Sequence, residues 1–250
     1  MRAQLFAVLS VLAALGGCAK KPADEHREKG LAAFRRSDFG DAGVELKASL
    51  ELEPQQDQAL YEKAAFSFMK AGATDEAAAL LEKTVALRAS EEDKLAVLRN
   101  IAGMYMQAGN QAKAEHYFQQ AVTLKADDTQ SLAWLAELAA QRGGARSNDA
   151  TPEPGELEKA LGYYEKLIAL SPGDPAPYTN KRIALVKYQR HFQEQAKSAL
   201  QDAEDNKADK EVQSDFLEQA KKHQAKVAEL DGVIAETTKK LSEALKAKKR

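Results

Sequence analysis

The chain has 250 residues and a nearly balanced formal charge of −2, so it lacks the strongly basic balance that is typical of nucleic-acid-binding proteins. Its single cysteine excludes a disulfide framework, and the fold must be stable by packing alone. Aromatic residues are only 6% of the chain, and alternating β-branched runs are missing. Both features favour an all-α fold over a sheet protein.

The N-terminal stretch, residues 1–17, predicts a signal peptide. It has one early charge, Arg2, and an apolar run over residues 5–15. This run is shorter than the roughly 20 residues that a membrane-spanning helix needs. It ends in Leu-Gly-Gly directly before Cys18, which resembles the bacterial lipobox. The alternative is an ordinary secretory leader followed by a chance thiol.

The lipobox resemblance implies a diacylglycerol thioether and N-acylation at Cys18. Two or more acyl chains anchor a protein stably. A residue other than Asp at position 19 is compatible with delivery to the outer membrane, so we expect a periplasm-facing lipoprotein of the bacterial envelope, at the outer rather than the inner membrane. The tether, residues 18–22, reaches only roughly 15 Å, which predicts a fold close to the membrane surface.

Residues 95–126 predict two helices joined by a tight turn at Gly109, since glycine accepts the positive φ of such turns. The apolar residues fall at helical spacing. Those of the first helix are Leu98, Ile101, Ala102 and Tyr105, and those of the second are Ala114, Phe118, Ala121, Val122 and Leu124.

This pattern of small, aromatic and glycine positions resembles the tetratricopeptide repeat (TPR), with its period of about 34 residues. Similar spacing recurs from about residue 23 to 54, from 58 to 89 and from 129 to 172. The second helices end in the apolar residues Leu52, Leu87, Leu124 and Leu170. The resemblance implies a right-handed superhelical solenoid with four repeats in residues 23–172. Members of the TPR family bind other proteins, so the resemblance also implies a protein-binding function.

An insertion at residues 143–155 lengthens the turn of the fourth repeat. It is rich in Gly, Pro, Ser, Asn and Asp, which predicts a mobile surface loop. Trp134, on the preceding helix, is predicted to be half-buried.

The repeat pattern weakens after residue 172. We expect the prolines of residues 172–177 to delay the next helix until about Tyr178. Residues 178–205 and 210–247 then predict two long helices, and Gly232 weakens the second. The second carries a heptad-like seam: Phe216, Ala220, His223, Val227, Leu230, Ile234, Thr237 and Leu241. The two helices either pair and cap the repeats or form a docking or dimerisation arm, and both alternatives remain open.

The sequence offers no candidate catalytic or metal site. The four histidines are scattered without metal-ligand spacing, and the glycines stand at turns rather than in a phosphate-binding loop. We therefore predict no enzyme and no cofactor.

The TPR resemblance implies a ligand groove along the first helices of the repeats. The groove positions are Arg27, Leu31, Phe34, Arg35, Glu62, Phe66, Met69, Lys70, Arg99, Met106 and Gln107, with Ala133, Glu137 and Gln141 in the fourth repeat. Apolar groove residues suit an apolar peptide or helix. The alternative is that these side chains wedge between adjacent repeats or lie under a lid helix.

The clamp that some TPR proteins use for chaperone C-termini is disfavoured, because its asparagine positions fall on Leu31, Phe66, Gly103 and Glu137.

Two functional hypotheses follow. The first is an adaptor that assembles or stabilises an envelope complex, similar in plan to type IV pilus pilotins and to the repeat lipoproteins of β-barrel assembly. Its partner would be an envelope protein. The second is a structural scaffold that acts as a homo-oligomer through residues 210–247. A cell-wall enzyme is a distant third, since no nucleophile and base can be named.

Overall fold

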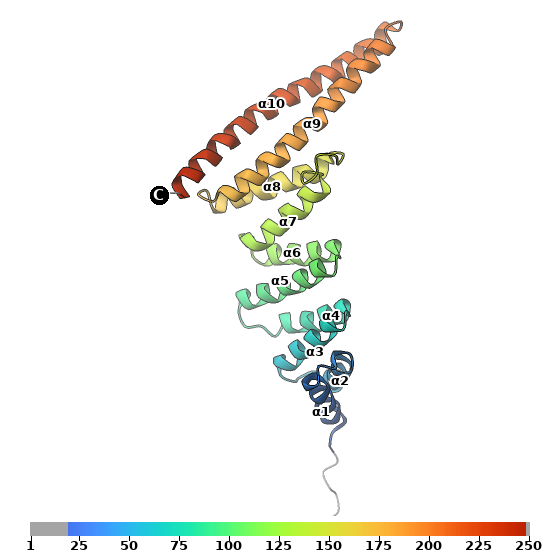
Figure 1. Ribbon diagram of the computed structural model, residues 1–250, viewed down its shortest axis with the longest axis vertical. Helices are drawn as coiled ribbons and strands as arrows, with labels where there is room; N and C mark the ends of the chain where they lie inside the picture. The colour runs from blue at the N-terminus through green and yellow to red at the C-terminus, as the bar shows by residue number, and fades with distance from the viewer. Residues whose placement is uncertain (1–19, 249–250) are drawn as a thin grey trace, which may run out of the picture. The chain divides into compact units, whose positions relative to one another are not determined.

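The computed structural model describes residues 20–248. The expected signal peptide and the first two residues of the tether, Cys18 and Ala19, lie outside the described residues. The described part of the chain consists of ten α-helices and contains no strand (Figure 1). This confirms the prediction of an all-α fold with four helix pairs and two long C-terminal helices. The chain forms two compact units, one up to Ala89 and one from Ser90.

The first unit contains two helix pairs. They are α1 (Pro22–Arg35) with α2 (Phe39–Leu52), and α3 (Gln58–Lys70) with α4 (Thr74–Val85). Consecutive helices pack on one another. A Cβ atom at Gly30 would lie 2.7 Å from Leu46 Cγ, so α1 and α2 approach too closely there for any side chain. The small residues Ala42 and Ala77 are fully buried on the second helices, as the repeat spacing predicts.

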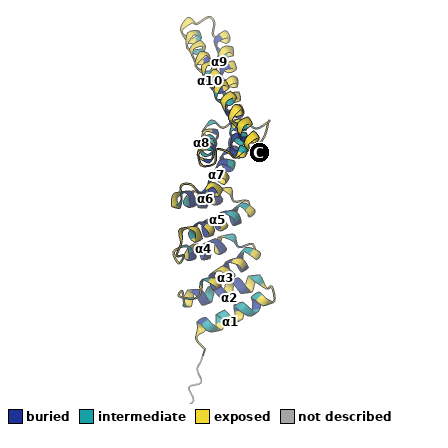
Figure 2. Ribbon diagram, turned by 90° about the vertical axis from the view of Figure 1, so that its left-hand side faces the viewer, coloured by how far each residue is buried: buried dark blue, intermediate teal, exposed yellow. Residues whose placement is uncertain are grey.

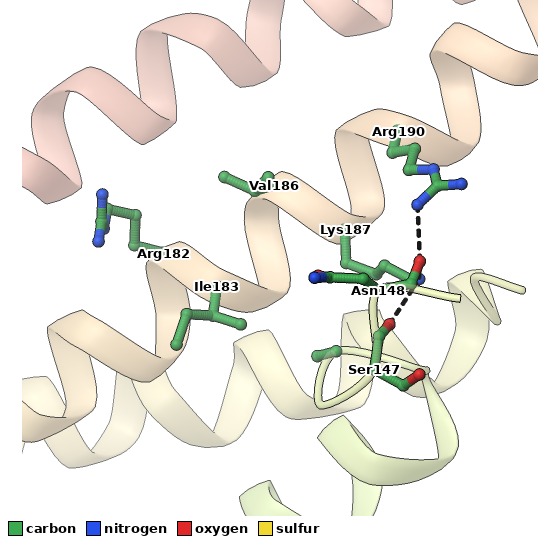
Figure 3. Close-up of a pocket in the computed structure, with 8 residues that line it drawn as sticks. Ser147, Asn148, Arg182, Ile183, Val186, Lys187 and Arg190 are labelled. Carbon is green, nitrogen blue, oxygen red and sulfur yellow. Dashed lines mark hydrogen bonds between the residues drawn. The ribbon is translucent and has the colours of Figure 1, made fainter. Parts of the chain in front are cut away.

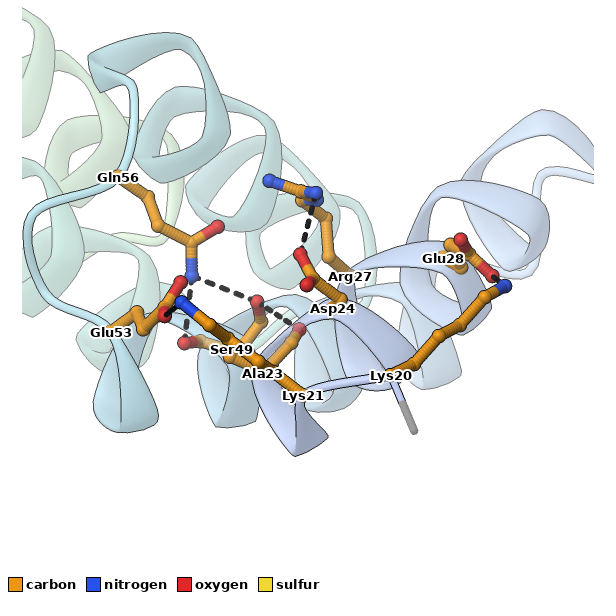
Figure 4. A network of polar contacts seen from close by, with 9 residues as sticks. All are labelled: Lys20, Lys21, Ala23, Asp24, Arg27, Glu28, Ser49, Glu53 and Gln56. Carbon is orange, nitrogen blue, oxygen red and sulfur yellow. Dashed lines mark hydrogen bonds and ion pairs between the residues drawn. The ribbon is translucent and has the colours of Figure 1, made fainter. Parts of the chain in front are cut away.

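A buried serine fixes the start of α1 to the end of α2 (Figure 4). Ser49 Oγ donates a 2.7 Å hydrogen bond to the carbonyl of Ala23, and Gln56 Nε2 donates to the carbonyl and hydroxyl of Ser49 at 2.8 and 2.9 Å. Lys21 also pairs with Glu53 at 3.0 Å. The first helix is therefore held where the chain leaves the predicted tether.

The second unit begins with two further pairs. They are α5 (Glu91–Gln107) with α6 (Gln111–Leu124), and α7 (Thr129–Arg142) with α8 (Pro154–Leu170). Ala114 and Ala160 are fully buried on the second helices, and Tyr105 and Phe118 lie in the core as expected.

The same backbone device closes all four pairs. The only residues with positive φ among those described are Ser37, Gly72, Gly109 and Gly144, one at each turn between paired helices. The next residue in each turn donates its N–H to the carbonyl five positions back, at 2.8–3.0 Å. This is the Schellman ending, which satisfies carbonyls that the helix leaves unpaired.

The long helix α9 (Pro175–Asp205) begins in the same way as a first repeat helix. Asp57 before α3 and Asp174 before α9 both accept a hydrogen bond from the N–H two residues later, at 3.1 and 3.0 Å. Tyr61 and Tyr178, each four residues after its aspartate, donate to a proline carbonyl in the preceding loop at 2.9 and 3.2 Å. The expected start at Tyr178 was wrong, because proline fits the first helical turn, where its missing N–H has no partner to lose.

No turn interrupts α9 where a repeat would have one. Gln189 stands as far after Asp174 as Gly72 stands after Asp57, and it remains helical and buried. Its side chain instead donates to Asp231 of α10 at 2.7 Å.

The last helix, α10 (Lys210–Lys248), runs back along α9, and Gly232 does not break it (Figure 1). The predicted seam faces α9: Ala220, Leu230 and Thr237 are buried, and the ring of His223 lies 5.9 Å from that of Phe192. The two helices form a hairpin whose exposed residues lie on its outer faces (Figure 2). The seam on which the expected homo-oligomer was based is therefore occupied within the chain.

One feature of the repeat pattern differs from expectation. The apolar residues near the ends of the second helices are exposed, because the chain leaves the helix pair there and no neighbouring helix covers them. They are Leu52, Leu87, Leu124 and Leu170.

Candidate binding surface on the first helices

Three phenylalanines meet in the first unit and form what we call the aromatic cluster. Phe34 lies in the last turn of α1, Phe39 begins α2 and Phe66 lies on α3, with ring centroids 5.7–5.9 Å apart. These are favourable aromatic pair distances. Phe66 nevertheless keeps 39% of its surface exposed. Two predicted groove positions of successive repeats, Phe34 and Phe66, thus come together. Phe39, which was not among the predicted groove positions, joins them.

Two lysines border the aromatic cluster. Lys63 Nζ lies 5.0 Å from the ring centroid of Phe34, and Lys70 Nζ lies 5.4 Å from that of Phe66. Cations at such distances are attracted to ring faces. Lys70 was predicted and Lys63 was missed, although its position three residues before Phe66 places it on the same face of α3. The surface therefore offers an apolar centre with positive charge beside it.

Two other charged groove positions of the first unit, Arg27 and Glu62, already have partners. Arg27 pairs with Asp24 of its own helix at 2.7 Å. Glu62 pairs with Arg88, which follows α4. A ligand would compete with these pairs. The remaining predicted residues are partly or fully exposed: Leu31, Arg35 and Met69.

In the second unit, Arg99 braces α5 against α7. Its guanidinium pairs with Asp128 and with Glu92, both at 3.1 Å. Asp128 is only 5% exposed. It caps α7, because its side chain accepts a 3.2 Å hydrogen bond from the N–H of Ser131. The structure thus gives the predicted groove residue Arg99 a place in the scaffold. Two other predicted residues of α5 remain partly or fully exposed: Met106 and Gln107.

A cavity of about 310 Å³ lies among α7, α8 and the start of α9. The predicted groove position Ala133 lines it, together with Tyr164 and Asn180. Asn180 was not predicted. Since α9 begins like α3, Asn180 occupies the position of Lys63, and that register could have identified it.

The predicted position Glu137 is tied to the insertion. Arg146 donates to its carboxylate, and Gln141 Nε2 donates at 3.3 Å. The hydrogen bond from Arg146 holds the pKa of Glu137 below its ordinary value, against a smaller opposing effect of burial. Glu137 therefore stays ionised, and its carboxylate binds Arg146 of the insertion.

The insertion at residues 143–155, whose composition predicts a mobile loop, is hydrogen-bonded to α9 (Figure 3). Lys187 of α9 is only 6% exposed, and its ammonium donates to the carbonyls of Ser147 (3.0 Å), Asn148 (3.4 Å) and Ala150. Arg190 adds a 2.7 Å hydrogen bond to the carbonyl of Asn148. The loop is thereby pinned to α9 by a cation some 40 residues further along the chain.

Trp134 packs as expected. Its ring stacks on Phe118 with centroids 5.8 Å apart and planes 9° from parallel, and 40% of the residue stays exposed.

Within residues 20–248, no group of three or more His, Cys, Asp or Glu side chains could hold a metal ion. No helix in that part of the chain is both long and apolar enough to cross a membrane.

Solved structures decide the fold. A TPR protein of Bacteroides fragilis (BF2334) aligns with 90% of this chain and 98% of its own length, at a TM-score of 0.51 and 12% sequence identity. The chain has the tetratricopeptide-repeat fold. Its helical solenoid elements are those that the repeat spacing predicted.

Two other similar structures align less well, each at a TM-score of 0.41. MamA is 18% identical over 83% of this chain and 94% of its own. YrrB, described as a TPR protein with an unusual peptide-binding site, is 17% identical over 91% of this chain and 92% of its own. No protein-family model and no curated protein matches the sequence.

Proposed function

We propose that this TPR protein is a protein-binding adaptor that holds a peptide or helix of an envelope protein on its first helices. The observation that carries the proposal is the aromatic cluster. Phe66 remains exposed although it contacts Phe34 and Phe39. Exposed aromatic residues in such a setting are typical of binding surfaces.

The chemistry beside the cluster indicates the kind of ligand. Lys63 and Lys70 place two cations at its edge, so a suitable peptide presents an apolar side chain to Phe66 and a carboxylate to the lysines. Apolar contact gives most of the affinity, and the charge pairs fix the register.

The proposed location rests on the lipobox ending at Cys18. Lipidation there would place the adaptor in the bacterial envelope, at the outer membrane and facing the periplasm. By its plan of lipobox and repeats, we propose a role in assembling or stabilising an envelope complex, such as a pilus secretin or the outer-membrane machinery. Replacing Cys18 by Ser should move the protein from the membrane fraction to the soluble fraction and remove the acyl mass. An unchanged distribution would refute the anchor.

The binding surface can be tested with a photo-crosslinking phenylalanine analogue placed at Phe66 in living cells. The matched control carries it at Val44, an exposed apolar residue on α2. We expect one partner to crosslink from position 66 and not from 44.

The charge-introducing variant Phe66→Glu should then weaken the purified complex by at least about tenfold, the usual effect of losing an aromatic anchor. Circular dichroism checks that the variant stays folded. Equal crosslinking from both positions, or a folded Phe66→Glu variant that binds the same partner equally well, would exclude the surface.

A further inference from the structure

The outer face of α9 carries a row of exposed residues, on the side that α8 and α10 leave uncovered. Two of them are apolar: Val186 is 50% exposed and Leu200 is 43% exposed. They are two heptads apart, so they share one face of the helix. The centre of this face is formed by Arg182, Val186, Gln193, Leu200 and Glu204, and the exposed Arg190 and Lys197 lie along its edge.

The residues of this row are arranged symmetrically about Gln193, so the row is complementary to a second copy of itself that runs in the opposite direction. Val186 and Leu200 are equally far from Gln193 in opposite directions, and so are Arg182 and Glu204. An apolar residue therefore mirrors an apolar residue, and a cation mirrors a carboxylate. Such a row suits an antiparallel contact with an identical helix, in which residue i meets residue j twice.

We propose that the outer face of α9 is a self-association surface, on which a second copy of this chain packs antiparallel with its two-fold axis at Gln193. In that pairing Arg182 meets the partner's Glu204, and Val186 meets the partner's Leu200. Each contact occurs twice. Within residues 20–248 Arg182 has no ion pair of its own, and Glu204 has only the exposed pair with Lys207, which contributes little.

The charge distribution along the hairpin selects the antiparallel orientation. Residues 181–190 hold four cations, of which Arg182 and Arg190 are exposed, and no carboxylate, whereas residues 202–218, around the tip, hold seven carboxylates and two lysines. Parallel hairpins would place like charges together, which is unfavourable. Antiparallel hairpins place the acidic tip of each copy beside the basic segment of the other.

A cavity supports the apolar part of the contact. It measures about 270 Å³ and lies between α9 and the insertion, where Ala145, Ile183 and Val186 supply apolar lining (Figure 3). The insertion is held there by Lys187, so the cavity has a fixed wall. The partner's Leu200 would reach this cavity when Val186 lies opposite it, and burying a leucine is favourable.

This surface is separate from the aromatic cluster and from the α10 seam, so the proposal does not depend on the proposed function. It also differs from the oligomer expected through residues 210–247, since the residues in the row belong to α9.

Disulfide trapping tests the geometry. In the full chain with Cys18→Ser, the variant Gln193→Cys places two thiols at the two-fold axis, where Cα atoms within about 4.4–6.8 Å can be bridged. We expect mild oxidation to give a covalent dimer. The control Lys239→Cys, at an exposed position of α10 away from the proposed contact, should give no covalent dimer. Failure of the position-193 variant to crosslink in preference to the control would overturn the proposal.

Charge reversal tests the pairing by sedimentation velocity over a concentration series. Arg182→Glu alone and Glu204→Arg alone should each raise the dimer dissociation constant by at least about tenfold. The double variant should return to within about threefold of the parent, because both ion pairs are restored with opposite polarity.

Lys83→Glu, an exposed reversal on α4, should have no effect. A parent chain that is monomeric up to about 100 µM, single reversals without effect, or a double variant that stays dissociated would each overturn the proposal.

Discussion

Arg99 of α5 and Asp128, the residue that caps α7, form an ion pair at 3.1 Å, and the aspartate is nearly buried. The cation therefore stabilises a charge that the fold has removed from water, and it links two successive helix pairs of the second unit. Arg99, which was predicted to contact a ligand, is therefore part of the scaffold that holds the helices together.

Removing this cation should be costly. Arg99→Ala leaves the carboxylate of Asp128 without its charged partner, and we expect the free energy of unfolding to fall by about 2 kcal/mol. Urea denaturation of the purified chain measures it. Arg36→Ala, at an exposed position after α1, should change stability by less than about 0.5 kcal/mol. An equal effect of the two substitutions would contradict the role of the pair.

The pinned insertion makes a local prediction. Lys187→Met deletes the ammonium that bonds the carbonyls of residues 147–150. We expect protease cleavage within the insertion to accelerate by about tenfold, because the segment opens without global unfolding. Lys239→Met is the control on an exposed lysine. Unchanged cleavage in the Lys187 variant would show that the loop is held by other contacts.

Two glycines near the end of α5 should respond in opposite directions to the same substitution. Gly109 has φ of 75°, so Gly109→Ala should destabilise the second unit by about 1 kcal/mol. Gly103 lies inside the helix, with open space where a Cβ would sit. Gly103→Ala should therefore stabilise by about 0.5–1 kcal/mol. Thermal unfolding followed by circular dichroism compares them, and shifts of the same sign would refute the assignment of the turn.

The buried phenol of Tyr164 predicts a pH dependence. Burial raises its pKa to about 12, above the ordinary value near 10. The folded state thus holds this proton more tightly than the unfolded state. The resulting stability is fully present below about pH 10 and is lost as the pH rises towards 12.

Absorbance titration at 295 nm checks this pKa by difference. The parent curve minus the Tyr164→Phe curve should show one group that titrates near pH 12. A difference curve with its midpoint near 10 would mean that the phenol is accessible to water.

The repeat core could be predicted from the sequence because it depends on local spacing. Ala42, Ala77, Ala114 and Ala160 are all fully buried, as their period implied. The pattern could not show that Leu52 and its equivalents are exposed, since exposure there depends on where the neighbouring helix ends.

Interactions between distant residues account for the other differences. The insertion looked mobile because its own composition is that of a loop, whereas the cation that holds it, Lys187, belongs to α9. Only part of the candidate site could be predicted from the sequence. Phe34 and Phe66 could be placed by repeat register, but their contact with Phe39 required the three-dimensional packing of α1, α2 and α3.

The missing turn at Gln189 also limits how this protein can change in length. Repeat proteins grow by duplicating whole helix pairs, and a new pair needs the free flank of a completed one. Here α9 has no second helix of its own, and α10 occupies the flank on which one would pack. Duplicated repeats could be accommodated only upstream of Pro172. The hairpin therefore acts as a terminator, and extra repeats added experimentally should be inserted before α9.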